Sequence, residues 1–247
     1  MQKNHMQKNR FTLSRRLVCG LSIVALTGGV LAYTASQITL PGIATDVSTA
    51  ESTRLFPDPT ADLTASTEGG LQTAVFAGGC FWGMEAVFEH VKGVTDVVSG
   101  YSGGTAETAN YEQISAGVTD HAEGVQVTYD PSQVTYGQLL KVYFSVAHNP
   151  TELNRQGPDV GTQYRSAIFV ETEQQRQVVQ AYIDQLDAAQ VFDKAIATQI
   201  EPLTEFYAAE GYHQDFIAQN PNYPYVIVHD LPKIAQLRAQ WPDLYRN

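Results

Sequence analysis

The stretch TAVFAGGCFWGMEAVFEHV, residues 73–91, has the pattern of a strand, a sharp turn and the first part of a helix. Residues 73–77 are apolar and short enough for a buried strand. Apolar residues then follow Cys80 at intervals of 4, 7, 8 and 11, which is the spacing of one helix face. Cys80 is therefore predicted to lie at the N-terminus of a helix, where unpaired backbone N–H groups favour a thiolate.

The rest of the chain after residue 71 alternates strand and helix signals. Strands are predicted at 73–77, 94–99, 123–129, 166–170 and 196–200, and helices at 80–91, 135–147, 173–189 and 206–218. Thr135 and Thr172 each precede a Gln by three residues, the spacing of a capping box. Strict βαβ regularity is missing, and several strands have one polar face. We predict an α+β fold, a two-layer mixed sheet with helices packed mainly on one side, in a single catalytic domain.

Charge separates the N-terminus from the body of the chain. Five basic residues precede the first acid, Asp46, although the net charge of the whole chain is −11. An uncharged, mostly apolar run then covers 17–33, so residues 1–33 are predicted to be a signal peptide or a retained membrane anchor. Either would place the body outside the cytoplasm. The acidic body is not expected to bind nucleic acid.

Residues 34–70 contain eight Thr, four Ser and three Pro and have no apolar period. They are predicted to be a flexible tether. Residues 71–247 are long enough for one substantial core, and we expect this domain to be a monomer.

Cys80 is the only cysteine after Cys19, and it follows two glycines that leave its sulfur open to a ligand. A lone cysteine in apolar surroundings is often an inert core residue. The glycines and the position at a helix start favour a nucleophile instead. In the predicted strand 123–129, Glu123 shares the core-facing side with Val125 and Val127. Burial there would raise its pKa and make it a proton donor near neutral pH, unless the side chain bends out to water.

Other side chains are candidates for binding a substrate. Tyr101 and Tyr164 lie in loops where a hydroxyl can donate to a ligand oxygen. Phe81 and Trp82, directly beside the thiol, are either core aromatics or the walls of an apolar slot. Asp159 by itself is typical of a turn.

The six histidines have no paired metal-ligand spacing, and we expect no metal. No motif for nucleotide binding or serine hydrolysis is present.

Four motifs together resemble the A-class peptide methionine sulfoxide reductases. They are GCFWG (79–83), GYSGG (100–104), HAE (121–123) and GTQYRS (161–166), in the order of that family. The resemblance extends from about residue 72 to residue 225. It implies an enzyme that reduces free and protein-bound methionine S-sulfoxide and repairs oxidised proteins.

The resemblance also implies roles for the candidate residues. The Cys80 thiolate attacks the sulfoxide sulfur and becomes a sulfenic acid, while Glu123, helped by Tyr101 and Tyr164, protonates and holds the oxygen. Asp159 matches a position in the active-site loop and orders water or Tyr164. The adjacent aromatics Phe81 and Trp82 cage the substrate methyl group.

One feature departs from many members of that family, which carry resolving cysteines near the C-terminus. This sequence has none after Cys80. We therefore expect no bound cofactor and an external thiol reductant, either thioredoxin, an exported thioredoxin-like protein, or glutathione with glutaredoxin. Two other classes use the same residues differently. A cysteine hydrolase would need a histidine base such as His121, and a binding module would keep Cys80 protonated and inert.

Overall fold

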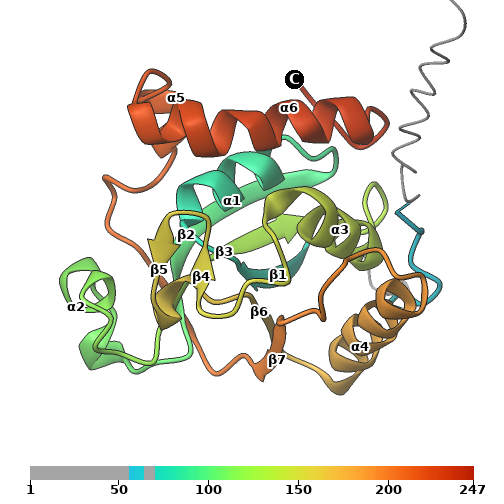
Figure 1. The fold of residues 1–247 in the computed structure, drawn as a ribbon, viewed down its shortest axis with the longest axis horizontal. Coiled ribbons are helices and arrows are strands. Elements are labelled where there is room, and N and C mark those ends of the chain that lie inside the picture. Colours follow the sequence, from blue (N-terminus) through green and yellow to red (C-terminus); the bar gives the residue numbers. More distant parts are fainter. Residues whose placement is uncertain (1–55, 64–69) are drawn as a thin grey trace, which may run out of the picture. The chain divides into compact units, whose positions relative to one another are not determined.

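The computed structural model describes residues 56–63 and 70–247. Its main element is a six-stranded mixed sheet with the strand order β7-β6-β1-β3-β2-β8 (Figure 1). Only the β6–β7 pair is parallel among these neighbours, and the other four pairs are antiparallel. The strands are β1 (Gln72–Ala77), β2 (Val94–Ser102), β3 (Ala122–Tyr129), β6 (Ala167–Val170), β7 (Gln199–Pro202) and β8 (Phe206–Ala208).

The two faces of this sheet carry apolar clusters of different extent. In β1, Ala74 and Phe76 face the main core, whereas Val75 and Ala77 face a smaller cluster on the opposite side. Alternation with period two separates the faces. Burial of a large side chain such as Phe76 stabilises the fold by about 1.5–3 kcal/mol. The helices α1, α3 and α4 contribute buried residues to the larger cluster, and the predicted α+β fold is confirmed.

The helices cover that face in two groups. Helix α1 (Phe81–Glu89) packs on β2 and β3 and contacts α6 (Leu231–Gln240), so that it lies between the sheet and α6 (Figure 1). Helices α3 (Tyr136–Val142) and α4 (Glu173–Ala188) contact each other, and α4 also contacts β6 and β7. Both predicted capping boxes are present at the starts of α3 and α4. A π-helical turn, Tyr143–Ala147, continues α3.

The helix predicted over 206–218 is wrong. Residues Phe206–Ala208 form β8 instead, which pairs with β2 from Gly100 to Ser102. The following helix α5 is limited to Phe216–Gln219, because Asp215 before it has the left-handed φ of 53°. The open backbone groups at the edge of β2 are paired in this way by the hydrogen bonds of β8. Local helix propensity does not anticipate such pairing. The sequence patterns also left unpredicted α6, α2 (Tyr111–Ser115) and the hairpin of β4 (Arg155–Gln156) with β5 (Asp159–Val160).

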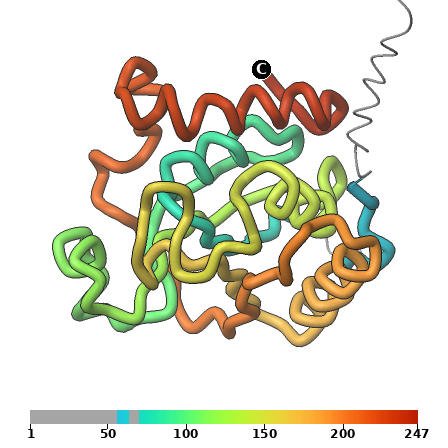
Figure 2. Tube along the Cα trace, viewed as in Figure 1, coloured from blue at the N-terminus to red at the C-terminus, as the bar shows by residue number. Residues whose placement is uncertain are grey.

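Residues 56–63 lie against the folded domain, although the sequence assigned them to the tether. Tyr182 of α4 donates its hydroxyl to the carbonyl of Pro57 at 2.9 Å. The backbone N–H of Gly137 donates to the Asp62 carboxylate, also at 2.9 Å. Figure 2 shows this blue segment beside the orange helix α4. The folded body therefore includes a segment that begins before the predicted boundary, because side chains of α4 donate to its backbone carbonyls and its Asp62 carboxylate accepts from the start of α3.

The remaining predictions for the N-terminus fall outside the described residues. These are the signal peptide or anchor over 1–33 and the other parts of the tether. Within 56–63 and 70–247, no helix is long and apolar enough to cross a membrane.

Candidate active site

Cys80 lies in the turn between β1 and α1, as the N-cap residue of that helix. The two preceding glycines are needed because other side chains approach their Cα atoms closely. A Cβ at Gly78 would lie 2.8 Å from the ring of His148, and one at Gly79 would lie 2.6 Å from the Gln156 side chain. Gly79 also has a φ of +90°, which side-chain-bearing residues rarely adopt. The glycines thus let the Cys80 turn pack directly on its neighbours.

A cavity of about 160 Å³ opens at Cys80. Six of the seven site residues predicted from the sequence line it: Cys80, Phe81, Trp82, Glu123, Asp159 and Tyr164. Three tyrosines that were not predicted complete the lining: Tyr111, Tyr223 and Tyr225. The cavity is small and mainly aromatic, with hydroxyl and carboxyl groups in its lining, which suits a compact substrate that has one polar atom.

Glu123 is the buried carboxyl group of the cavity. It is 2% exposed, and the backbone N–H of Phe81 donates to it at 3.3 Å. Burial raises its pKa to about 8, and the nearby Asp159 adds to this, while the Phe81 N–H opposes it. The predicted burial of this strand face and the predicted rise in pKa are both confirmed. At neutral pH Glu123 therefore holds a proton that it can donate.

The surroundings of the Cys80 thiol disfavour its thiolate form. Burial raises its pKa well above the usual value, and the carboxyl groups of Glu123 and Asp230 raise it further wherever they are ionised. The backbone N–H of Trp82 acts in the opposite direction but is outweighed. The thiolate expected from the helix N-terminus is therefore disfavoured, because desolvation and nearby carboxylates exceed the effect of the helix end.

The aromatic walls are held in place by stacking. Trp82 stacks on Phe216 of α5 with ring centroids 3.7 Å apart and an interplanar angle of 7°. Its indole N–H donates to Nδ1 of His213 at 3.2 Å. Phe81 is 1% exposed, and its ring centroid lies 5.0 Å from that of His213. Both walls present rigid apolar surface beside the sulfur of Cys80.

Asp159 reaches the cavity from the β4–β5 hairpin. The hydroxyl of Tyr225 donates to its carboxylate. Burial raises the pKa of Tyr225, so that the hydroxyl remains a donor at any ordinary pH. The family resemblance implied that Asp159 orders water or Tyr164, and the structure adds Tyr225 as its partner.

Tyr164 ends the 3-10 turn Thr162–Tyr164 and is half-buried at the cavity. Burial raises its pKa, with further contributions from Glu123 and Asp159. Its hydroxyl is therefore protonated across the working pH range and can donate to a ligand oxygen.

Tyr101 does not line the cavity. It is fully buried, and its hydroxyl donates to Glu210 at 2.9 Å. The same carboxylate accepts the backbone N–H of Tyr111, again at 2.9 Å. Tyr101 thus supports the start of α2, and Tyr111 supplies the tyrosine that reaches the cavity. The sequence signal that could have placed Tyr111 at a helix start is Asn110, a typical N-cap residue. Its side chain accepts from the backbone N–H of Gln113 at 3.1 Å.

His121, the candidate base of a cysteine hydrolase, is also outside the lining. Its Nε2 lies 3.0 Å from the carbonyl oxygen of Thr105, and the side chain is fully buried. Among the described residues, no group of three His, Cys, Asp or Glu side chains could hold a metal ion. The fold and the cavity together define an enzyme site with one thiol, one protonated carboxyl group and hydroxyl donors.

Comparisons with known proteins identify the family. Residues 72–245 match the family described as peptide methionine sulfoxide reductase. The chain is 58% identical over 192 residues to peptide methionine sulfoxide reductase MsrA 2 of Synechocystis sp., covering 77% of this chain and 90% of that protein. It is 61% identical over 176 residues to MsrA 2 of Mesorhizobium japonicum, covering 71% and 90%. The solved structure of methionine sulfoxide reductase A of Corynebacterium diphtheriae aligns with a TM-score of 0.54 and 38% identity, covering 67% of this chain and 82% of the other.

The chain therefore belongs to the peptide methionine sulfoxide reductase family, A class (MsrA), and is a peptide-methionine (S)-S-oxide reductase.

Proposed function

We propose that the sulfur of Cys80 attacks the sulfoxide sulfur while Glu123 gives its proton to the sulfoxide oxygen. The attack forms an S–S bond between Cys80 and the substrate and turns the sulfoxide oxygen into a hydroxyl group. That hydroxyl then passes to the Cys80 sulfur as the substrate S–O bond and the new S–S bond break, so methionine leaves and Cys80 becomes a sulfenic acid. The substrate sulfur is reduced by two electrons and the cysteine sulfur is oxidised by two. The proton that Glu123 donates is replaced by the one that the thiol loses, so the step balances. The position of a protonated carboxyl group in the same cavity as the thiol carries this proposal.

The other lining residues bind the sulfoxide group. Tyr164 and Tyr111 both line the cavity, and in this proposal their hydroxyls donate to the oxygen, in the way that hydrogen-bond donors stabilise developing negative charge. Phe81 and Trp82 enclose the methyl group, which favours a methyl sulfoxide over bulkier groups. The cavity accepts only the end of a side chain, which is compatible with free methionine sulfoxide and with oxidised methionine in proteins. Repair of oxidatively damaged proteins follows from the second substrate.

An external thiol completes the cycle in this proposal. The sequence contains two cysteines, and Cys19 lies within the apolar run of residues 17–33, far from Cys80 in the sequence. A sulfenic acid on Cys80 therefore needs attack by an outside thiol, which releases water and leaves a mixed disulfide. A second thiol then resolves that disulfide and restores Cys80. Thioredoxin, an exported thioredoxin-like protein, or glutathione with glutaredoxin has the required chemistry.

The stoichiometry without reductant tests the chemistry and the recycling. The full chain carrying Cys19→Ser is reduced, freed of reductant and mixed with methionine S-sulfoxide. One methionine and one sulfenic acid per protein, trapped by a cyclic 1,3-diketone, are expected. Release of two methionines per protein, or methionine without trapped sulfenic acid, would contradict the proposal.

The partner can be trapped separately. A thioredoxin that lacks its second cysteine should remain bound to Cys80 as a mixed disulfide after one turnover. Its failure to form that adduct, while glutathione with glutaredoxin supports turnover, would assign recycling to the glutathione pathway.

The location outside the cytoplasm is part of the same proposal and rests on the basic N-terminus and the apolar run of residues 17–33. Fractionation of cells that express the full chain should place the domain in the membrane or extracytoplasmic fraction. An intact chain in the cytoplasm would contradict it.

A further inference from the structure

We propose that Gln163 and Arg165, the residues on either side of Tyr164, are positioning residues that hold Tyr164, Glu123 and Tyr111 in their working arrangement. The inference rests on the roles proposed above for those three side chains. The three come from separate elements: a 3-10 turn, strand β3 and helix α2.

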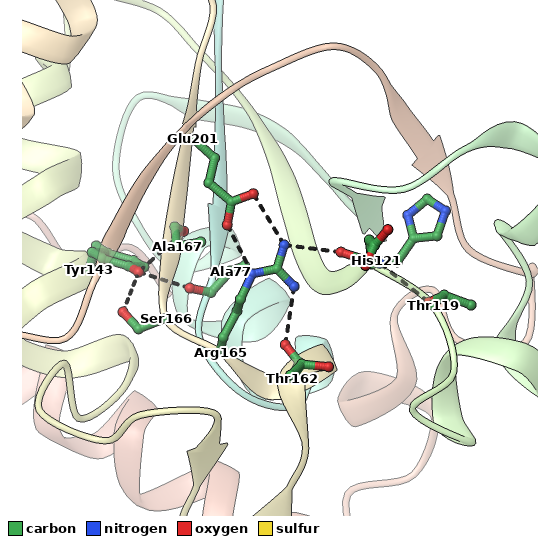
Figure 3. A network of polar contacts seen from close by, with 10 residues as sticks. Ala77, Thr119, His121, Tyr143, Thr162, Arg165, Ser166, Ala167 and Glu201 are labelled. Carbon is green, nitrogen blue, oxygen red and sulfur yellow. Dashed lines mark hydrogen bonds and ion pairs between the residues drawn. The ribbon is translucent and has the colours of Figure 1, made fainter.

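Arg165 joins the turn of Tyr164 to the start of the strand that carries Glu123. Its side chain is buried, at 8% exposure for the residue, and donates from Nη1 to the carbonyl of Thr162 and from Nη2 to that of Asp120, each at 3.1 Å. Thr162 begins the 3-10 turn, and Asp120 comes just before β3 (Ala122–Tyr129). Figure 3 shows the guanidinium group between these segments. One rigid planar group thus fixes the distance between the two segments.

Glu201 of β7 fixes the orientation of that guanidinium group. Its carboxylate accepts from Nε of Arg165 at 2.9 Å and from Nη2 at 3.2 Å (Figure 3). A bidentate pair of this kind permits one orientation of the fork, so that the remaining N–H groups point at the two carbonyls. The charge of Arg165 is neutralised by the same contact.

Gln163 joins the same turn to α2, the helix that begins with Tyr111. It is 4% exposed, and its Nε2 donates to the carbonyl of Ser115, the last residue of α2, at 3.3 Å. Gly161 makes room for this side chain, because a Cβ there would lie 2.1 Å from the Gln163 Oε1 atom. The turn is therefore tied on one side to α2 and on the other to β3, with Tyr164 between the two ties.

Loss of the hydrogen bonds made by Arg165 or Gln163 should slow the chemical step more than it weakens substrate binding. A displacement of about 1 Å between a proton donor and its acceptor costs about 10²-fold in rate. For Arg165→Met we expect the single-turnover rate of methionine release to fall at least tenfold, with a change of less than threefold in KM. Arg165→Lys keeps the charge but lacks the planar fork, so its single-turnover rate should lie between the rates of Arg165→Met and the parent.

The pH profile distinguishes positioning from loss of stability. A loosened β3 start admits water to Glu123, so the pH above which the single-turnover rate declines should move down from about 8 toward the ordinary range of a carboxyl group. Substitution of a residue that merely stabilises the fold would not shift this decline in rate at high pH.

Arg246 provides the matched control. It also donates to backbone carbonyls, those of Glu89 and Val94, but does not line the cavity. Arg246→Met should lower the thermal midpoint and leave the rate and the pH profile of the folded protein unchanged. Gln163→Met is the second test of the ties, for the case in which Arg165→Met does not fold.

The outcomes are separable from those of the proposed function. If the full-length parent releases one methionine per Cys80, the proposed chemistry stands. The positioning role is then overturned if Arg165→Lys and Gln163→Met keep the parent's rate within twofold and its pH limb. The positioning role is equally overturned if Arg246→Met changes the single-turnover rate and the pH profile as much as Arg165→Met does.

Discussion

Two buried carboxyl groups of this protein differ in what lies beside them. Glu123 on β3 and Glu85 on α1 are each 2% exposed, and burial raises their pKa values to about 8 and about 7. Glu123 lines the cavity of Cys80, whereas Glu85 does not, and the charged neighbours that raise its pKa further are Glu89 and Asp215. A raised pKa by itself therefore does not mark an active site in this molecule. Glu123 differs from Glu85 in lining a cavity together with a thiol, that of Cys80.

Removal of the nucleophile should have the largest effect on turnover. Cys80→Ser is expected to abolish methionine release, because a serine hydroxyl supplies almost no anion at ordinary pH. The measurement is methionine formed from methionine S-sulfoxide in the presence of excess dithiol. Turnover at the parent's rate would mean that the cavity acts without its thiol, and the contrast with Glu85 would lose its basis.

Glu123→Gln is expected to reduce the single-turnover rate by about 10²-fold, the usual contribution of a positioned acid. Only the protonated carboxyl group donates, so the parent's rate should fall as pH rises through about 8. The variant should lack that decline. Single-turnover rates of the parent and the variant, measured between pH 6 and pH 9.5 with KM determined in parallel, give both the loss in rate and its pH dependence. An unchanged rate would assign Glu123 a structural role only.

A smaller effect is expected at the other carboxylate of the cavity. Tyr225→Phe removes the hydroxyl that donates to Asp159 and leaves the carboxylate with one partner fewer. Loss of such a bond should lower kcat/KM about 3- to 10-fold. The variant retains the ring, so its thermal midpoint provides the control for packing. A decrease as large as that of Glu123→Gln would place Tyr225 among the residues that contact the reacting atoms.

Glu85→Gln should leave the turnover rate within twofold and change stability instead. The pKa of Glu85 is raised from 4.5 to about 7 in the folded protein, so the folded state binds this proton more tightly than the unfolded state. Its stabilising contribution is complete below pH 4.5 and is lost as pH rises to about 7, with a total of about 3 kcal/mol. Urea unfolding at pH 5 and pH 8 should therefore show a smaller pH dependence for the variant than for the parent. A tenfold loss of activity in Glu85→Gln would contradict the distinction drawn between the two acids.

Local sequence patterns were sufficient to predict the elements that contain Cys80 and Glu123. The apolar strand at 73–77, the two glycines and the 3.6-residue period after Cys80 predicted the strand, turn and helix that the structure contains. The period of two in β3 predicted that Glu123 would be buried with Val125 and Val127. These patterns are reliable because burial of one face depends on neighbours within a few residues along the chain.

The choice between tyrosines depended on partners distant in sequence. Tyr101 stands in a glycine-rich segment that favoured a ligand-binding role, but it donates to Glu210, which is 109 residues away. Strand β8 replaced a predicted helix because it pairs with the edge of β2, and Pro57 is held by Tyr182, 125 residues away. Local propensity differs little between such alternatives, and the long-range hydrogen bonds and burial of the tertiary structure decide between them.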